Sequence, residues 1–147
     1  MKIVDPKTVI EESIRKIVGP DVSFVVEHPK EESHGDFASN VALAAYTKFS
    51  KENPRKLADE LVSMLKNDTQ LSSVVNASEI SVAGPGFINF WLSKEWLTNE
   101  LKNIITSGDN YGKDDSGKGK KVLVEYSSPN IAKQFSIGHL RSTIIGQ

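Results

Sequence analysis

The sequence predicts an α+β fold, in which helices cover one face of a small antiparallel sheet. Several segments repeat apolar residues with the period of a helix, which is the first observation behind this class. Two short segments suited to strands also flank a turn at Gly84-Pro85-Gly86, and helices and strands do not alternate as they do in βαβ proteins. With 38% apolar and 25% charged residues, the 147-residue chain has the composition of a folded globular protein.

The first predicted helix begins at Asp5-Pro6, because Asp can accept the free N–H groups of a helix start and Pro fits its first turn. One apolar stripe follows, made of Ile10, Ile14, Ile17 and Val18. It ends near Gly19-Pro20. Residues Val22 to Glu27 are rich in β-branched side chains and predict a strand.

The middle of the chain predicts two helices. From Phe37 to Phe49 the sequence is rich in alanine, which favours a helix that breaks before Asn53-Pro54. Asn53-Pro54 then repeats the signal of a cap followed by proline. The next helix turns Leu57, Leu61 and Leu65 to the core.

A pair of strands and a last helix complete the first predicted domain. Glu79–Ala83 and Phe87–Leu92 predict strands joined by the glycine–proline turn. Ser93 can cap a helix that ends near Gly108. Its helical spacing predicts an apolar face made of Leu97, Leu101, Ile104 and Ile105.

The C-terminal part predicts the start of a second domain. Residues 106–121 contain almost no apolar side chain and predict a linker, so we expect a first domain over 1–110, a linker over 111–120 and a second domain over 121–147. Lys121–Tyr126 predicts a strand, followed by a loop and a helix that opens at Gly138-His139. This is the first strand and loop of a Rossmann-like α/β domain, and we expect a fragment of a longer protein because a parallel strand needs partners.

Several kinds of protein are excluded or disfavoured. The absence of cysteine excludes disulfides, thiolate nucleophiles and cysteine-bound zinc, and the three histidines lack metal-ligand spacing, so we expect no metal site. The N-terminus does not resemble a signal peptide and no apolar run approaches about 20 residues, which predicts a cytoplasmic protein without a membrane partner. Residues 1–115 carry 13 basic and 18 acidic side chains, whereas residues 116–147 carry five and one. This basic end suggests phosphate or nucleic-acid contact, or only a solvated surface.

The segment from Ser127 to Thr143 has the layout of a phosphate-binding site. It follows a predicted strand and enters the N-terminus of a helix, where ligands of open α/β sheets bind. Lys133 and His139 could supply positive charge to phosphates, and Gly138 leaves room for a flat ring. An ordinary strand–loop–helix connection explains the spacing equally well. In the first domain, His34-Gly35-Asp36-Phe37 is either a plain loop or a site that presents an aromatic ring to RNA.

The segment from Val124 to Lys133, followed by Gly138-His139-Leu140-Arg141-Ser142-Thr143, resembles the first signature of class I aminoacyl-tRNA synthetases, and the arginyl-tRNA synthetases in particular. The first domain is similar to the N-terminal extension of that family in Gly35–Ala42, Asn53–Ala58 and Gly84–Phe90. The resemblance covers nearly the whole chain, and three separated motifs in the right order make it more specific than any one of them.

The resemblance implies a ligase of protein biosynthesis that activates arginine with ATP and transfers it to arginine tRNA. It places Lys133, Ser136 and His139 at the ATP phosphates as catalytic residues and Gly138 at the adenine, with magnesium expected to accompany ATP. It assigns the substrate arginine to Glu125, Ser127, Ser128 and Asn130. Ser136 departs from the family pattern, which has histidine there, and its hydroxyl can donate a hydrogen bond but carries no charge.

The resemblance also implies that the first domain touches the outer corner of tRNA through Asn40, Phe87 and Asn89, although an apolar ring such as Phe87 is more often part of a core. We expect a monomer, and we expect the 147-residue chain to be inactive by itself. An alternative is a stand-alone RNA-binding or interaction module derived from a synthetase. A third possibility, an ordinary nucleotide-binding protein, takes no account of the first domain.

Overall fold

The computed structural model describes residues 4–113, 115, 117–127, 129, 130 and 132–147. Its contacts divide the chain into two compact units, Met1–Tyr111 and Gly112–Gln147. The first unit holds all of the sheet and the core, and the second holds one helix with the segments that lead to it.

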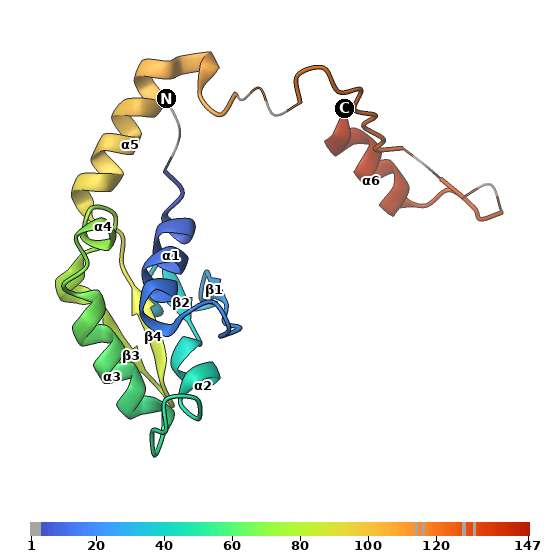
Figure 1. The fold of residues 1–147 in the computed structure, drawn as a ribbon. Helices are drawn as coiled ribbons and strands as arrows, with labels where there is room; N and C mark the ends of the chain where they lie inside the picture. Colours follow the sequence, from blue (N-terminus) through green and yellow to red (C-terminus); the bar gives the residue numbers. More distant parts are fainter. Residues whose placement is uncertain (1–3, 114, 116, 128, 131) are drawn as a thin grey trace. The chain divides into compact units, whose positions relative to one another are not determined.

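Four short strands form one antiparallel sheet in the order β1-β2-β4-β3 (Figure 1). They are β1 (Val26–Glu27), β2 (Phe37–Ser39), β3 (Ser81–Ala83) and β4 (Phe87–Phe90). Phe37 pairs with Phe90 and Val82 with Ile88, so these side chains share one face and pack in the core. The predicted α+β architecture with a small antiparallel sheet is therefore confirmed.

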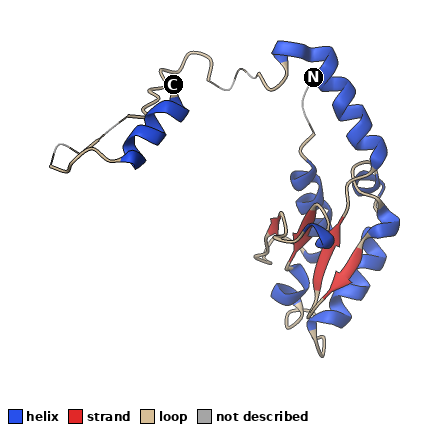
Figure 2. Cartoon of the chain, turned by 180° about the vertical axis from the view of Figure 1, so that it is seen from behind, coloured by secondary structure: helices blue, strands red, loops and turns tan. Residues whose placement is uncertain are grey.

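The helices α1 (Pro6–Val18), α2 (Val41–Ala45) and α3 (Pro54–Leu65) pack against the strands, and α4 (Thr69–Ser72) packs against α1. The predicted starts of α1 and α3 are correct: Asp5 accepts hydrogen bonds from Lys7 and Thr8, and Asn53 accepts one from Lys56 at 2.9 Å. Short 3₁₀ turns lie at Glu32–His34, Ala77–Glu79 and Gly108–Asn110. Seen from behind, the long helices leave the strands uncovered on one side (Figure 2).

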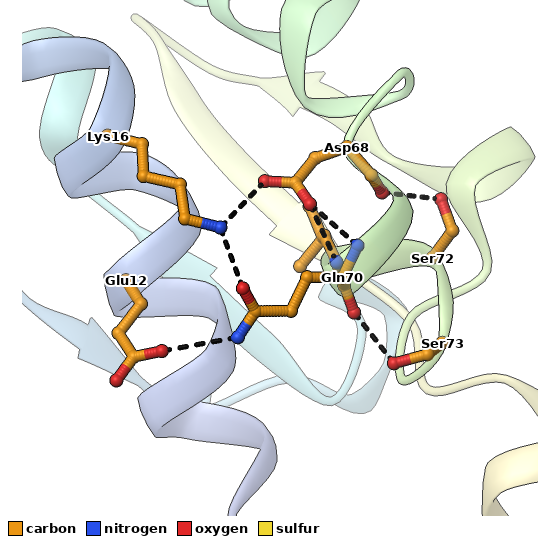
Figure 3. A network of polar contacts seen from close by, with 7 residues as sticks. Glu12, Lys16, Asp68, Gln70, Ser72 and Ser73 are labelled. Carbon is orange, nitrogen blue, oxygen red and sulfur yellow. Dashed lines mark hydrogen bonds and ion pairs between the residues drawn. The ribbon is translucent and has the colours of Figure 1, made fainter.

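A polar network joins α1 to α4 (Figure 3). Lys16 Nζ donates to Gln70 Oε1 at 2.7 Å and lies 3.6 Å from Asp68 Oδ2, while Gln70 Nε2 donates to Glu12. Asp68 caps α4 by accepting from the N–H groups of Gln70 and Leu71. Partial burial opposes ionisation of Asp68, but the hydrogen bonds from the Leu71 and Gln70 N–H groups, the nearby Ser13 hydroxyl and the charge of Lys16 together outweigh it and lower its pKa.

Two predictions between residues 22 and 49 are wrong in extent. The predicted strand from Val22 is only Val26–Glu27. Arg15 donates to the carbonyl oxygen of Val22 at 3.1 Å and lies over the ring of Phe24, so these two residues contact α1 instead of pairing with a neighbouring strand. The predicted helix from Phe37 begins four residues later, because Phe37–Ser39 is a strand paired with β4. Its helix, α2, ends at Ala45.

Helix α5 (Lys94–Ser107) begins at the predicted cap, where Ser93 Oγ accepts from the N–H of Trp96 at 3.1 Å. The apolar face that helical spacing predicts is not covered by the rest of the described chain: Leu97, Leu101 and Ile105 are all exposed, and no residue of this helix is buried. Tyr111 Oη donates to Glu100 Oε1 at 2.7 Å, and this hydrogen bond raises the pKa of Tyr111.

The second unit contains α6 (Ile137–Gly146), which begins one residue before the predicted start. The predicted strand Lys121–Tyr126 is not formed: its residues have no strand partner within the described part of the chain. Leu123 is 92% exposed. A strand exists only through pairing, so the apolar, β-branched composition alone does not produce one.

Candidate functional site

The uncovered face of the sheet in the first unit holds a cavity of about 570 Å³. Glu27, Ala38 and Phe87 belong to this face, because they alternate with the buried residues of their strands. Nine residues line the cavity: Val25, Glu27, Pro29, His34, Ala38, Asn40, Ala83, Gly84 and Phe87. Two of the three predicted tRNA-contact residues, Asn40 and Phe87, are therefore brought to one site.

Phe87 is the exposed aromatic ring of this face. Its side chain is 40% exposed, whereas Ile88 and Phe90 on the same strand are fully buried. An aromatic ring that is open to solvent beside a cavity can stack on a nucleic-acid base. The alternative interpretation of Phe87 as a core residue is thus wrong.

The other two predicted residues of this group are more enclosed. Asn40 Oδ1 accepts a hydrogen bond from the Val25 N–H at 2.9 Å, so its NH₂ group is the part available to a ligand in the cavity. Asn89 pairs with Ala38 and Ser81 and shares their face, but it is only 5% exposed. Asn89 therefore lies under this surface rather than on it.

The loop before β2 has a structural role. Phe37 is 5% exposed, so the idea that it offers its ring to RNA is wrong. His28 stacks on Phe37 with ring centroids 4.3 Å apart, and Asp36 Oδ2 accepts from the Leu92 N–H at 2.8 Å. Of the loop residues singled out from the sequence, only His34 lines the cavity.

The hairpin turn that borders the cavity is held against the start of α3. A side chain at Gly86, which has φ +136°, would place its Cβ 3.1 Å from Pro54. Arg55 Nη1 also donates to the Gly84 carbonyl oxygen at 3.0 Å. The motif Asn53–Ala58 does not by itself indicate a role for Arg55. Its contact with the hairpin arises only when the chain folds.

In the second unit, Ser136 and His139 lie at the start of α6. The Ser136 N–H donates to His139 Nδ1 at 3.1 Å, and Ser136 Oγ lies 2.8 Å from the same nitrogen. A ring nitrogen that accepts from a backbone N–H carries no hydrogen, so this hydrogen bond fits the imidazole tautomer that has its hydrogen on Nε2. In that tautomer the Nε2–H of His139 is a hydrogen-bond donor that a ligand can reach at the start of α6.

The other predicted nucleotide and arginine residues lie on the segment before α6, except Gly138, which is in the first turn of that helix. Lys133, Gly138, Glu125 and Ser127 are exposed, and Ser127 accepts from Thr143 Oγ1 at 3.0 Å. Asn130 Oδ1 accepts from the Ala132 N–H at 2.8 Å, which forms a local turn. Ser128 lies outside the described residues.

The donor set of this segment suits an anionic ligand. Residues 126–147 contain Lys133, His139 and Arg141 but no carboxylate side chain. Among the residues with described positions, no three His, Cys, Asp or Glu side chains are grouped to hold a metal ion, and no helix has the length and hydropathy to cross a membrane.

Comparison with known proteins identifies the family of the first unit. Residues 6–92 match the family described as "Arginyl tRNA synthetase N terminal domain". The chain belongs to this family. In this arginyl-tRNA synthetase N-terminal domain, the matched region ends at Leu92, just before α5, and therefore includes the whole sheet and its cavity. Residues 100–147 match "tRNA synthetases class I (R), catalytic domain".

Individual relatives agree with the family match. An arginine–tRNA ligase of Oceanobacillus iheyensis is 37% identical over 127 residues, which cover 86% of this chain and 21% of the relative. That of Thermotoga maritima is 39% identical over 137 residues, covering 93% and 24%. The crystal structure of arginyl-tRNA synthetase from Plasmodium falciparum matches with a TM-score of 0.62 and 31% identity, covering 95% of this chain and 26% of that one. The chain thus spans about a quarter of the length of these relatives.

Proposed function

We propose that this chain is part of an arginine–tRNA ligase and that its first unit binds tRNA through the uncovered face of the sheet. The observation that carries the proposal is the exposed ring of Phe87 beside a cavity in the matched N-terminal domain. The ring can stack on an unpaired base, and the NH₂ group of Asn40 can donate to that base. Asn89, beneath the surface, supports the strand that carries Phe87 rather than contacting RNA first.

Binding of arginine tRNA to the 147-residue chain tests this proposal. Stacking of a base on an aromatic side chain contributes about 1–3 kcal/mol, so Phe87→Ala should weaken binding by about 5- to 150-fold. Phe87→Leu keeps apolar area but removes the ring, and it should weaken binding nearly as much. Leu101→Ala, which shortens an exposed apolar side chain outside this face, is the matched control.

Two results would contradict the proposal. In the first, the unsubstituted chain binds no tRNA at low salt. In the second, Phe87→Ala and Leu101→Ala have the same effect. A non-cognate tRNA measured in parallel separates recognition of arginine tRNA from general attraction to RNA, since non-specific binding is lost steeply as salt rises.

We also propose that residues 121–147 contribute to the ATP and arginine sites of the complete enzyme, which acts in the cytoplasm on magnesium-bound ATP, arginine and arginine tRNA. The match of residues 100–147 to the catalytic domain supports this role over a stand-alone RNA-binding module. Lys133 and the Nε2–H of His139 are the donors that fit phosphate oxygens, and Ser136 orients His139. Glu125 is a carboxylate suited to a guanidinium group.

Arginine-dependent pyrophosphate exchange by the complete enzyme tests these roles. Loss of one donor to a developing charge commonly lowers kcat by about 100- to 1000-fold, which is the expectation for His139→Ala. Glu125→Gln should instead raise KM for arginine more than KM for ATP. Unchanged kinetics in both variants would refute the assignment.

A further inference from the structure

Arg55 contacts the hairpin that borders the cavity on the uncovered face. Its Nη1 donates to the carbonyl oxygen of Gly84, a residue that lines this cavity. The hairpin tip and the start of α3 lie side by side in both views (Figures 1 and 2). One of the five guanidinium N–H donors is used in this bond, and the group is thereby held in a defined orientation.

The charge of Arg55 differs from that of the lysines around it. Lys51 pairs with Glu60 at 2.7 Å, and Lys56 pairs with Glu52. Arg55 is exposed and has no carboxylate partner among the described residues. Of the three basic residues near the start of α3, Arg55 is therefore the one that forms no ion pair among the described residues.

Helix stability does not explain this arginine. Arg55 lies in the first turn of α3, where the helix dipole disfavours positive charge by about 0.3–1 kcal/mol, and this turn contains no acidic residue. The hydrogen bond to Gly84 uses only one donor of a side chain that can contact phosphate through two parallel N–H groups. A ligand with negative charge would make use of the remaining donors.

We propose that Arg55 binds a backbone phosphate of the tRNA whose base enters the cavity beside Phe87. This inference rests on the proposed tRNA-binding function of the uncovered face, and adds to it a phosphate contact that fixes where the RNA strand lies. A phosphate contact carries no sequence information, so Arg55 contributes affinity and position, while the cavity selects the base.

The salt dependence of tRNA binding by the 147-residue chain tests this inference. Each phosphate neutralised on a single-stranded segment contributes about 0.7 to the slope of log K against log salt. Arg55→Gln should lower the magnitude of that slope by about 0.7 and weaken cognate and non-cognate tRNA equally. Arg55→Lys keeps the charge and should restore most of the slope.

Lys56→Gln is the matched control, since it removes the same charge from the neighbouring residue, where Glu52 already neutralises it. Thermal unfolding of each variant verifies that the hairpin and helix remain folded. The inference is overturned if Arg55→Gln leaves the slope unchanged or if Lys56→Gln lowers it equally. If the inference about Arg55 fails but binding still depends on Phe87, the proposed function stands. If the unsubstituted chain does not bind tRNA, both the inference and the proposed function are overturned.

Discussion

Gly35 and Gly19 provide a matched pair for measuring how closely β2 and β4 approach. Both glycines have positive φ with extended ψ, at φ 95° and ψ −176° for Gly35 and φ 84° and ψ 173° for Gly19. This region of backbone conformation is almost restricted to glycine. Substitution by alanine therefore imposes the same backbone cost at both positions, and only the surroundings differ.

The surroundings make Gly35→Ala the more destabilising change. A Cβ at Gly35 would lie 2.6 Å from the Phe90 carbonyl oxygen, whereas a Cβ at Gly19 would meet nothing within 4 Å. The same Phe90 oxygen accepts from the Asp36 N–H at 2.9 Å, so a shift that relieves the clash weakens this bond. The shared backbone cost is about 1–3 kcal/mol. At both positions, alanine also lowers the conformational entropy of the unfolded chain, which stabilises the folded state by about 0.4–1 kcal/mol.

Overpacking at Gly35 adds about 1–3 kcal/mol, and this is the expected difference between the two variants. Urea unfolding followed by the fluorescence of Trp91 and Trp96 measures it, provided that the m-value stays constant. Equal losses of unfolding free energy in Gly35→Ala and Gly19→Ala would refute the reasoning, because the contact with Phe90 would then impose no constraint. A smaller loss in Gly35→Ala would refute it more strongly.

Three further predictions concern stability and the His139 ring. Hydrogen bonds lower the pKa of Asp68, so its contribution to stability is complete above about pH 4 and is lost as the pH falls through the lowered pKa. In urea unfolding, the difference in unfolding free energy between the unsubstituted chain and Asp68→Asn should therefore decrease over that range of pH. Leu65→Ala should cost about 2–5 kcal/mol, whereas Ile105→Ala, at a 71% exposed position, should change stability by less than about 0.5 kcal/mol in the same assay. In the neutral ring of His139, Ser136→Ala should leave the hydrogen on Nε2, because the backbone N–H still donates to Nδ1; a nitrogen-15 spectrum of the neutral ring with hydrogen on Nδ1 would contradict this.

Local signals in the sequence were sufficient where one segment determines its own structure. Asp5 and Asn53 cap their helices as expected, and Gly84-Pro85-Gly86 joins two antiparallel strands. Each of these features depends on residues that are neighbours along the chain. The sequence could therefore predict both caps and the hairpin without knowledge of the remaining fold.

The errors arise where a distant partner decides the structure. Phe37–Ser39 precedes an alanine-rich segment and was expected to be helical, but pairing with β4, about 50 residues away, makes it a strand. The reverse error occurs at Lys121–Tyr126, whose composition favours a strand that no described segment pairs with. The apolar stripe of α5 shows that helical spacing predicts the helix but not what covers it.

The candidate site was predictable only in part, for the same reason. Phe87 and Asn40 were selected through a family resemblance, but their meeting at one cavity depends on strand pairing and on the bond from Val25 to Asn40. Arg55 was not assigned any role, since its bond to Gly84 joins residues 29 positions apart. Asn89 was selected with them, yet it is almost entirely buried.

Membership of a motif therefore does not by itself identify a residue that contacts RNA. Gly35 and Asp36 hold β2 against β4, and Gly86 allows the hairpin to approach Pro54. These residues build the uncovered face and have reason to be present even if no ligand binds. Phe87 and Arg55 are different, because Phe87 exposes its ring to solvent and Arg55 uses only one of its N–H donors in the bond to Gly84. Their substitution should therefore affect tRNA binding more than stability, whereas substitution of Gly35 should do the reverse.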